Sequence, residues 1–160
     1  MHHELIDTAL KLACHVDHLA PTQCDLRRAM STAYYAIFHF TATSCAKLLA
    51  GGQNKSMQRA EAQVFRSLDH KDIQSACALA MKPEMNFPQP IRDYARVCSN
   101  SYKSRLIADY DSEPSFVFSE EQVLNRLGEV EDAIKRFSSA DADDRRAFAV
   151  LLAVKMRKRT

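Results

Sequence analysis

Side chains that can bind an anion or move a proton gather in one short segment of the sequence. Arg28, Tyr34, Tyr35 and His39 bring a cation, two phenols and an imidazole into twelve residues. Tyr35 and His39 are four residues apart, a spacing that places two side chains on one face of an α-helix. There they would line a cleft together with Arg28. The more frequent role of such residues is that of polar groups satisfied inside a core.

A metal site is the second possible function of these residue types, because two cysteines and two histidines lie close together in the sequence. Cys14, His15, His18 and Cys24 contain zinc-binding residue types, but their spacing differs from the usual paired arrangement and no second pair completes it. No glycine-rich phosphate loop, nucleophile elbow or H-E-x-x-H pattern occurs in the sequence. The sequence therefore predicts neither a metal nor a cofactor.

Charge and cysteine usage indicate the setting of the protein. The net charge is +2, so a basic site must be local. The five cysteines are an odd count without C-x-x-C spacing or a preceding signal peptide, which predicts reduced, mostly buried thiols in the cytoplasm. The uncharged run 29–46 contains many polar residues, so we expect a buried helix rather than a membrane span.

Composition predicts an all-α protein that can position these residues. Hydrophobic residues make up 46% of the 160 residues, and only three glycines and five prolines interrupt them. A single domain of this length buries a substantial core, whereas a β-sandwich would need more turns. We therefore expect one helical domain over residues 1–160, with its core at about 5–137.

Periodicity and capping signals define the expected helices. They span about residues 4–19, 25–50, 56–81, 91–108, 119–137 and 142–157, and 67–69 is either a kink or a loop. Asp25 is the expected N-cap of the second helix, and Gly51-Gly52 its left-handed stop. Ser119 and Gln122 form a capping box. The last helix ends in a basic tail of Lys155, Arg157, Lys158 and Arg159, cations that favourably oppose the helix dipole or contact RNA phosphates.

Two segments resemble a known family. The run from Arg28 to His39, with its serine, paired tyrosine and Ala-x-Phe-His ending, is similar to the second helix of prokaryotic HEPN proteins. The segment Arg105–Asp111, followed by an acidic helix, resembles the end of the same family's third long helix. The resemblance covers roughly residues 5–137. It implies an antiparallel bundle of five to six helices, frequently a homodimer with the second helix and the Arg105 helix near a two-fold axis.

The resemblance also implies a function. Many HEPN proteins are metal-independent endoribonucleases of toxin–antitoxin or defence systems, and others are inactive scaffolds. A cognate antitoxin or a nucleotidyltransferase is the partner protein it implies. In active members, four to six residues separate an arginine from a following histidine. Here four residues separate Arg105 from Tyr110, and only three separate the nearest arginine–histidine pair, Arg66 and His70.

RNA cleavage through the 2′-hydroxyl needs a base, a cation for the phosphorane and an acid. The resemblance makes Arg105 the phosphate ligand, with Asp109 or Tyr110 as its polar partner, although a phenol of pKa about 10 is a poor base. Tyr102 and Lys103 precede them as candidate RNA contacts. Equally, the three residues Arg105, Asp109 and Tyr110 can simply end a helix. The competing hypothesis is an inactive dimer that binds a nucleotide or partner protein through a pocket of Arg28, Tyr35 and His39.

Overall fold

A computed structural model of the chain describes residues 1–14, 19–111 and 116–154. These residues form seven α-helices and one 3-10 helix, without a β-strand, which confirms the all-α class. The expected count of five to six helices was too low. The helices are α1 His2–Ala13, α2 Gln23–Ala50, α3 Lys55–Ser67, α4 His70–Ala80, η1 Pro83–Met85, α5 Gln89–Tyr110, α6 Glu120–Ser139 and α7 Ala142–Ala153.

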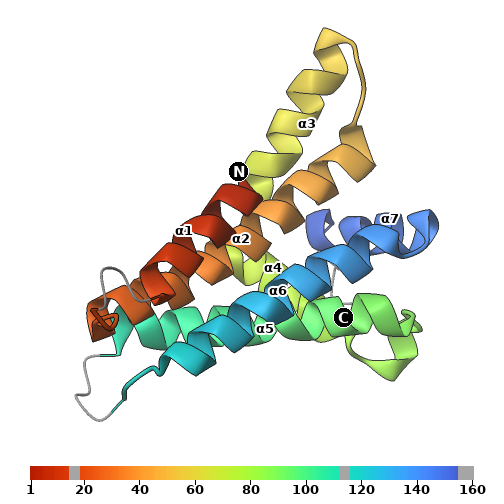
Figure 1. Cartoon of the computed structure of the whole chain (residues 1–160). Coiled ribbons are helices and arrows are strands. Elements are labelled where there is room, and N and C mark those ends of the chain that lie inside the picture. The colour runs from red at the N-terminus through yellow and green to blue at the C-terminus, as the bar shows by residue number, and fades with distance from the viewer. Residues whose placement is uncertain (15–18, 112–115, 155–160) are drawn as a thin grey trace.

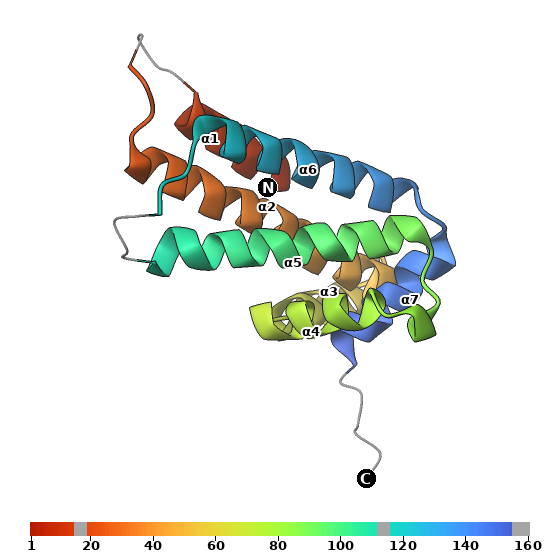
Figure 2. The same cartoon turned by 90° about the horizontal axis from the view of Figure 1, so that it is seen from below.

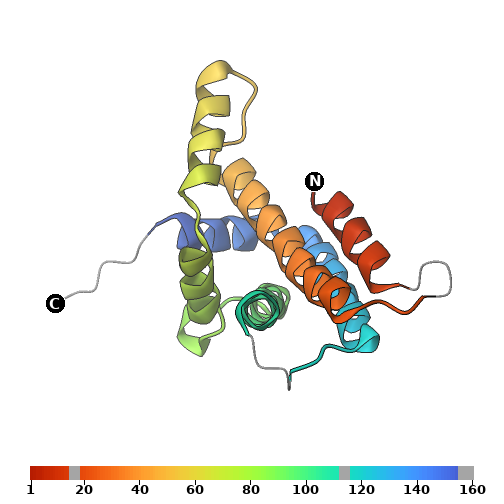
Figure 3. The ribbon, with the colours of Figure 1, turned by 90° about the vertical axis from the view of Figure 1, so that its left-hand side faces the viewer.

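Four helices lie side by side as a bundle. Figure 2 shows α1, α2, α5 and α6 roughly aligned, with α1 and α5 running opposite to α2 and α6. The helices α4 and α7 pack across one side of this bundle, and α3 projects from it beside the C-terminal end of α2 (Figures 1 and 3). Because α2 packs against α1, α3, α5, α6 and α7, it is the central helix that its uncharged sequence predicts.

The start of α2 differs from the prediction by three residues. Thr22, not Asp25, is the N-cap, and its hydroxyl accepts a hydrogen bond from the backbone N–H of Asp25 at 3.2 Å. The Asp25 carboxylate in turn accepts from the Thr22 backbone N–H at 2.9 Å. This reciprocal capping box satisfies two backbone donors, whereas Asp25 alone would satisfy one.

The ends of α1 and α2 also correct the prediction. Helix α1 ends at Ala13, not near residue 19, and Cys14 is extended, because the Cys, His, Val and Asp that follow are weak helix formers. Gly51 after α2 is also extended, with φ −64°, not left-handed. A glycine is needed at position 51 because the backbone there lies close to Lys47, and a Cβ atom would overlap the Lys47 carbonyl oxygen.

The open choice between a kink and a loop near residues 67–69 is resolved as a break between two helices. Helix α3 ends at Ser67, and the side chain of Asp69 caps α4 by accepting a hydrogen bond from the backbone N–H of Asp72 at 2.7 Å. Leu68 between them is buried, which fixes the connection against the core. The break places His70 at the first residue of α4, facing α2.

The two C-terminal helices, α6 and α7, mostly agree with the capping and periodicity signals in the sequence. Ser119 and Gln122 form the predicted capping box at the start of α6, and all five apolar residues of its seam are buried, namely Val123, Leu127, Val130, Ile134 and Phe137. Helix α7 ends at Ala153, earlier than predicted, and Val154 is extended. The basic tail of Lys155, Arg157, Lys158 and Arg159 lies outside the described residues.

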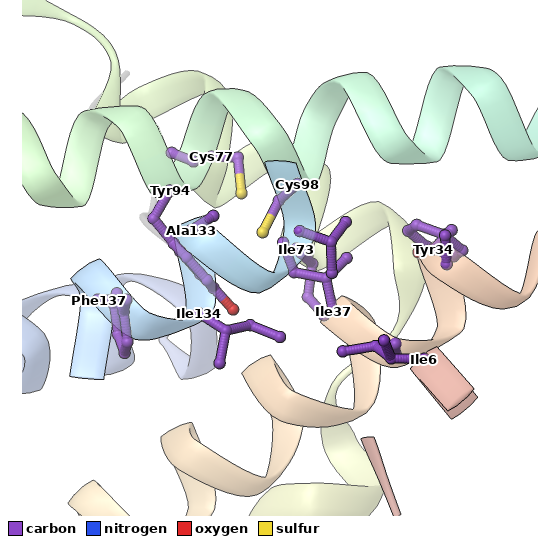
Figure 4. Close-up of a cluster of buried hydrophobic side chains, with 14 of the residues drawn as sticks. Ile6, Tyr34, Ile37, Ile73, Cys77, Tyr94, Cys98, Ala133, Ile134 and Phe137 are labelled. Carbon is purple, nitrogen blue, oxygen red and sulfur yellow. The ribbon is translucent and has the colours of Figure 1, made fainter. Parts of the chain in front are cut away.

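The core joins α2 to α4, α5 and α6 (Figure 4). Its labelled side chains include Tyr34 and Ile37 of α2, Cys77 of α4 and Tyr94 of α5. The Tyr94 hydroxyl lies 2.6 Å from the Thr41 hydroxyl, so this buried phenol is satisfied. The five cysteines are free thiols, three buried and two exposed. None of the described helices is long and apolar enough to cross a membrane.

Candidate functional site

The last two turns of α5 bring three predicted site residues into contact. The Nε atom of Arg105 lies 2.7 Å from the Oδ2 atom of Asp109, an ion pair between residues four apart on one helix face. The Nη2 group of Arg105 donates to the Tyr110 hydroxyl at 3.2 Å and to the Tyr35 hydroxyl, also at 3.2 Å. Arg105 therefore connects the end of α5 to the middle of α2.

Two aromatic rings, those of Tyr110 and Tyr35, cover the Arg105 guanidinium. Its Cζ atom lies 4.9 Å from the centre of the Tyr110 ring and 5.8 Å from that of Tyr35, distances typical of cation–π contacts. The Arg105 side chain is 12% exposed, whereas Tyr110, which covers it, is 68% exposed. Tyr110 is therefore the more exposed part of the cover over this guanidinium.

Arg105 keeps its charge and has donor capacity left over. Burial works to lower its pKa, but the hydrogen bonds with Tyr35 and Tyr110 and the Asp109 carboxylate raise that pKa overall. No hydrogen bond joins the Nη1 group of Arg105 to another described residue. An arginine with a free pair of N–H donors can bind an oxyanion such as a phosphate.

Arg27 of α2 holds the end of α5 that carries Asp109 and Tyr110. Its guanidinium donates to four backbone carbonyl oxygens, those of Ile107 and Ala108 at 3.3 Å each, Asp111 at 2.7 Å and Phe116 at 3.2 Å. The last carbonyl groups of a helix have no partner within it, and a cation there also opposes the helix dipole. Arg27 is thus a positioning residue for the Arg105 cluster.

A histidine from another helix lies beside this cluster. The Nδ1 atom of His70 is 2.6 Å from the Tyr34 hydroxyl. The His70 ring lies among four aromatic rings, with centroid distances of 4.4 Å to Phe38, 5.5 Å to Tyr34, 6.1 Å to Tyr35 and 6.4 Å to Tyr102. Tyr35 therefore contacts both Arg105 through its hydroxyl and His70 through its ring.

The surroundings favour the uncharged forms of His70 and Tyr34. Burial lowers the pKa of His70, and the positive charge of Arg105 lowers it further, against the opposing effect of Asp69. Burial also raises the pKa of Tyr34 well above its ordinary value. At neutral pH the site thus contains a neutral imidazole, a protonated phenol and a permanent guanidinium cation.

Six of the residues singled out in the sequence meet at this place: Tyr34, Tyr35, Tyr102, Arg105, Asp109 and Tyr110. Arg28 and Lys103 are exposed, and no hydrogen bond or ion pair joins either side chain to the described residues of the cluster. His39 packs its ring parallel to Phe65 at 6.2 Å, and its buried Nδ1 atom has no hydrogen-bond partner among the described residues. The Tyr35 hydroxyl is directed to Arg105, so the expected pocket of Arg28, Tyr35 and His39 stays a prediction.

The sequence did not predict His70 as a site residue, because the family resemblance implies a histidine shortly after the arginine. His70 instead precedes Arg105 by 35 residues. Its local signal is the Asp69 N-cap, which fixes where α4 begins but not what the helix faces. Among the described residues, no three histidine, cysteine or acidic side chains are grouped to hold a metal ion, and His15 and His18 lie outside that part of the chain.

Comparison with known proteins adds no relative to this picture. Neither family models, nor curated proteins, nor solved structures gave a match to the chain. The similarity of its two segments to HEPN proteins therefore stays a prediction, and the role of the site depends on its own geometry.

Proposed function

We propose that this protein is a HEPN-like protein that acts on RNA, in which Arg105 binds a phosphate group. The observation that carries the proposal is the Arg105 guanidinium itself. It is held in place by Asp109, Tyr35 and Tyr110, while its Nη1 group has no partner among the described residues. In the role we favour, the protein is a metal-independent endoribonuclease of a toxin–antitoxin or defence system.

Tyr110 gives the site a means of admitting a phosphate. Its ring covers Arg105 but is itself largely exposed, so it can turn aside without disturbing the core. A phosphate that reaches Arg105 gains two parallel charge-assisted hydrogen bonds from the fork of its guanidinium. The Tyr110 hydroxyl, released from Arg105, becomes a further donor to the same anion.

The projecting helix α3 supplies a surface that suits a longer polyanion. Lys55, Arg59 and Arg66 line a hollow of about 680 Å³ together with Gln58 and Gln63. None of the three cations forms an ion pair with another residue in the described part of the chain. Because α4 follows α3 directly and begins at His70, RNA phosphates lying along α3 would lead toward the Arg105 cluster.

The proposal keeps the partners that the family resemblance implies. These are a second copy of the chain, with α2 and α5 near the two-fold axis, and a cognate antitoxin or nucleotidyltransferase. Helix α5 has an exposed line of residues available for such a contact, formed by Asn100, Lys103 and Leu106.

A second candidate function is a regulatory module without catalysis that binds a nucleotide or a partner protein. The observation that favours it is the covered state of Arg105, whose side chain is only 12% exposed and already has an acidic partner. An arginine in such a contact stabilises the helix end without any ligand. In this case the protein would bind no RNA.

RNA binding to purified protein separates the two functions. A fluorescent mixed-sequence RNA pool is titrated in EDTA with the wild type, Arg105→Met and Arg96→Met. Arg96 is the matched control, an exposed arginine of the same helix with an acidic partner, Asp93, at 2.8 Å. We expect Arg105→Met to weaken binding about tenfold or more, since one charge-assisted contact contributes about 1.5–3 kcal/mol, and Arg96→Met to bind as the wild type. Equal affinity of the two variants, or no binding by the wild type, would refute the proposal.

A further inference from the structure

We infer that His70 is the proton-transfer residue of this site, supplied by α4 in place of the histidine absent after Arg105, and that Tyr34 positions it. The inference rests on the proposed action on RNA and adds the chemistry. One arrangement of side chains carries it. His70 is hydrogen-bonded to Tyr34, and its ring lies beside Tyr35. The Tyr35 hydroxyl in turn accepts a hydrogen bond from Arg105.

The adjacent tyrosines of α2 contact different site residues: Tyr34 contacts His70, and Tyr35 contacts Arg105. Tyr34 is almost fully buried at 1% exposure, and its hydroxyl is directed to the Nδ1 atom of His70. Tyr35 is half-buried, and its hydroxyl is directed to the Nη2 group of Arg105. Since neighbouring side chains on a helix point about 100° apart, this pair can contact α4 and α5 at once. One turn of α2 thus sets the imidazole and the guanidinium relative to each other.

The hydrogen bond with Tyr34 engages the Nδ1 atom of His70 and leaves the Nε2 atom for chemistry. Nδ1 is engaged, and the Nε2 atom has no hydrogen bond to another described residue. When Nδ1 carries the proton and donates to the Tyr34 oxygen, Nε2 presents a basic lone pair. A base for RNA cleavage needs such a lone pair, and His70 provides it in the tautomer in which the Tyr34 oxygen accepts.

The proton-transfer step balances without a metal. The Nε2 atom of His70 takes the proton of the RNA 2′-hydroxyl, and the 2′-oxygen forms a bond to the adjacent phosphorus. Arg105 stabilises the charge on the phosphorane oxygens. The bond from phosphorus to the 5′-oxygen then breaks, and that oxygen takes a proton from water. The products are a 2′,3′-cyclic phosphate and a free 5′-hydroxyl, and His70 returns its proton to solvent.

The groups facing His70 keep it in the basic form at neutral pH. They are Tyr34, Tyr35 and His39 of α2, Tyr102 and Arg105 of α5, and the preceding Asp69. Burial lowers the His70 pKa most, Arg105 and His39 lower it further, and Asp69 opposes them. The cleavage rate should therefore rise with pH through a pKa below 6.5 and then stay constant to neutral pH.

The test measures binding and cleavage of the same mixed RNA pool, in EDTA, by the wild type, His70→Gln, Tyr34→Phe and His3→Gln. We expect His70→Gln to bind RNA within twofold of the wild type but to cleave it about a hundredfold more slowly or worse. His3→Gln is the matched control, an exposed histidine of α1 outside the site, and should cleave as the wild type. Tyr34→Phe keeps the aromatic ring but removes the hydroxyl that is hydrogen-bonded to His70. The pKa that governs the acidic side of the cleavage pH profile should therefore shift.

The outcomes distinguish this inference from the proposed function. Wild-type protein that binds RNA but does not cleave it, or His70→Gln that cleaves normally, would overturn the role of His70 and leave RNA binding intact. Absence of both binding and cleavage would remove the proposed function and this inference together. A pool with 2′-O-methyl groups should bind without being cleaved, because its 2′-oxygen has no proton to give; its cleavage would equally overturn the mechanism.

A second measurement does not depend on any RNA. The pKa of His70 is followed by NMR in the wild type, Arg105→Met and Arg96→Met. Because the Arg105 charge lowers the His70 pKa, Arg105→Met should raise that pKa and Arg96→Met should leave it unchanged. An unchanged pKa in Arg105→Met would show that the two groups do not act as one site.

Discussion

Replacing Arg27 tests whether the end of α5 is held by α2. In Arg27→Met the aliphatic stem remains, but the donors to four backbone carbonyl oxygens are lost. The neighbouring Arg28 is exposed, and no hydrogen bond or ion pair joins its guanidinium to another described residue, so Arg28→Met is a matched control one residue away. The two variants remove the same charge from the same helix turn.

The magnitude follows from the geometry of the four hydrogen bonds. The bond to Asp111 at 2.7 Å is short, the bond to Phe116 is of ordinary length, and the two bonds at 3.3 Å share the nitrogen that the shortest one uses. Counting one strong and one ordinary bond from a charged donor gives about 2–3 kcal/mol. A domain of this size should then lose about 4–12 °C in Tm. Arg28→Met should stay within about 0.5 kcal/mol of the wild type.

Equilibrium unfolding by urea, followed by far-UV circular dichroism, measures both variants. Loss of the Arg27 contacts should also loosen Asp109 and Tyr110, so Arg27→Met should bind RNA more weakly than Arg28→Met. If the two variants have the same free energy of unfolding, Arg27 does not secure the helix end, and the geometry assigned to Asp109 and Tyr110 loses its basis.

Three further outcomes follow from the fold. Thr22→Ala removes the α2 capping box and should cost about 1 kcal/mol in urea unfolding, whereas an effect near zero would place the helix start elsewhere. Ile37→Ala in the core, where Ile37 is 0% exposed, should cost about 2–5 kcal/mol, and a cost below 1 kcal/mol would contradict this packing. His70 has a lowered pKa, so the unfolded chain binds more protons below pH about 6.5, and stability should be constant above that pH and fall below it. His70→Gln should flatten this fall, and an unchanged pH dependence would show that His70 is not desolvated.

The sequence predicted the fold class and most of the helices because apolar periodicity and capping chemistry are local properties. The apolar periodicity of the helix expected at about 119–137 and its Ser119 capping box are both confirmed. The prediction was wrong at helix ends, where several neighbouring residues can serve as the cap and small differences in hydrogen bonding decide between them. Thr22 takes the N-cap from Asp25 because the pair satisfies two donors, and Gly51 is required for a close approach to Lys47 rather than for a left-handed turn.

The site could be predicted only where its residues share a helix. Arg105, Asp109 and Tyr110 meet because spacings of four and five on α5 bring their side chains together. The direction of Tyr35 toward Arg105, and the arrival of His70 beside both, depend on how α2, α4 and α5 pack, which no local pattern encodes. The expected pocket of Arg28, Tyr35 and His39 depends on the same packing and stays a prediction.

The salt dependence of RNA affinity tests the central claim, that Arg105 binds a phosphate, most directly. Affinity for the mixed RNA pool is measured in EDTA at several salt concentrations for the wild type, Arg105→Met and Arg96→Met. Each phosphate contact to a single strand contributes about 0.7 to the slope of log affinity against log salt. The account predicts that Arg105→Met lowers the magnitude of this slope by about one contact, while Arg96→Met leaves it unchanged. An Arg105→Met slope and affinity equal to those of the wild type would contradict it.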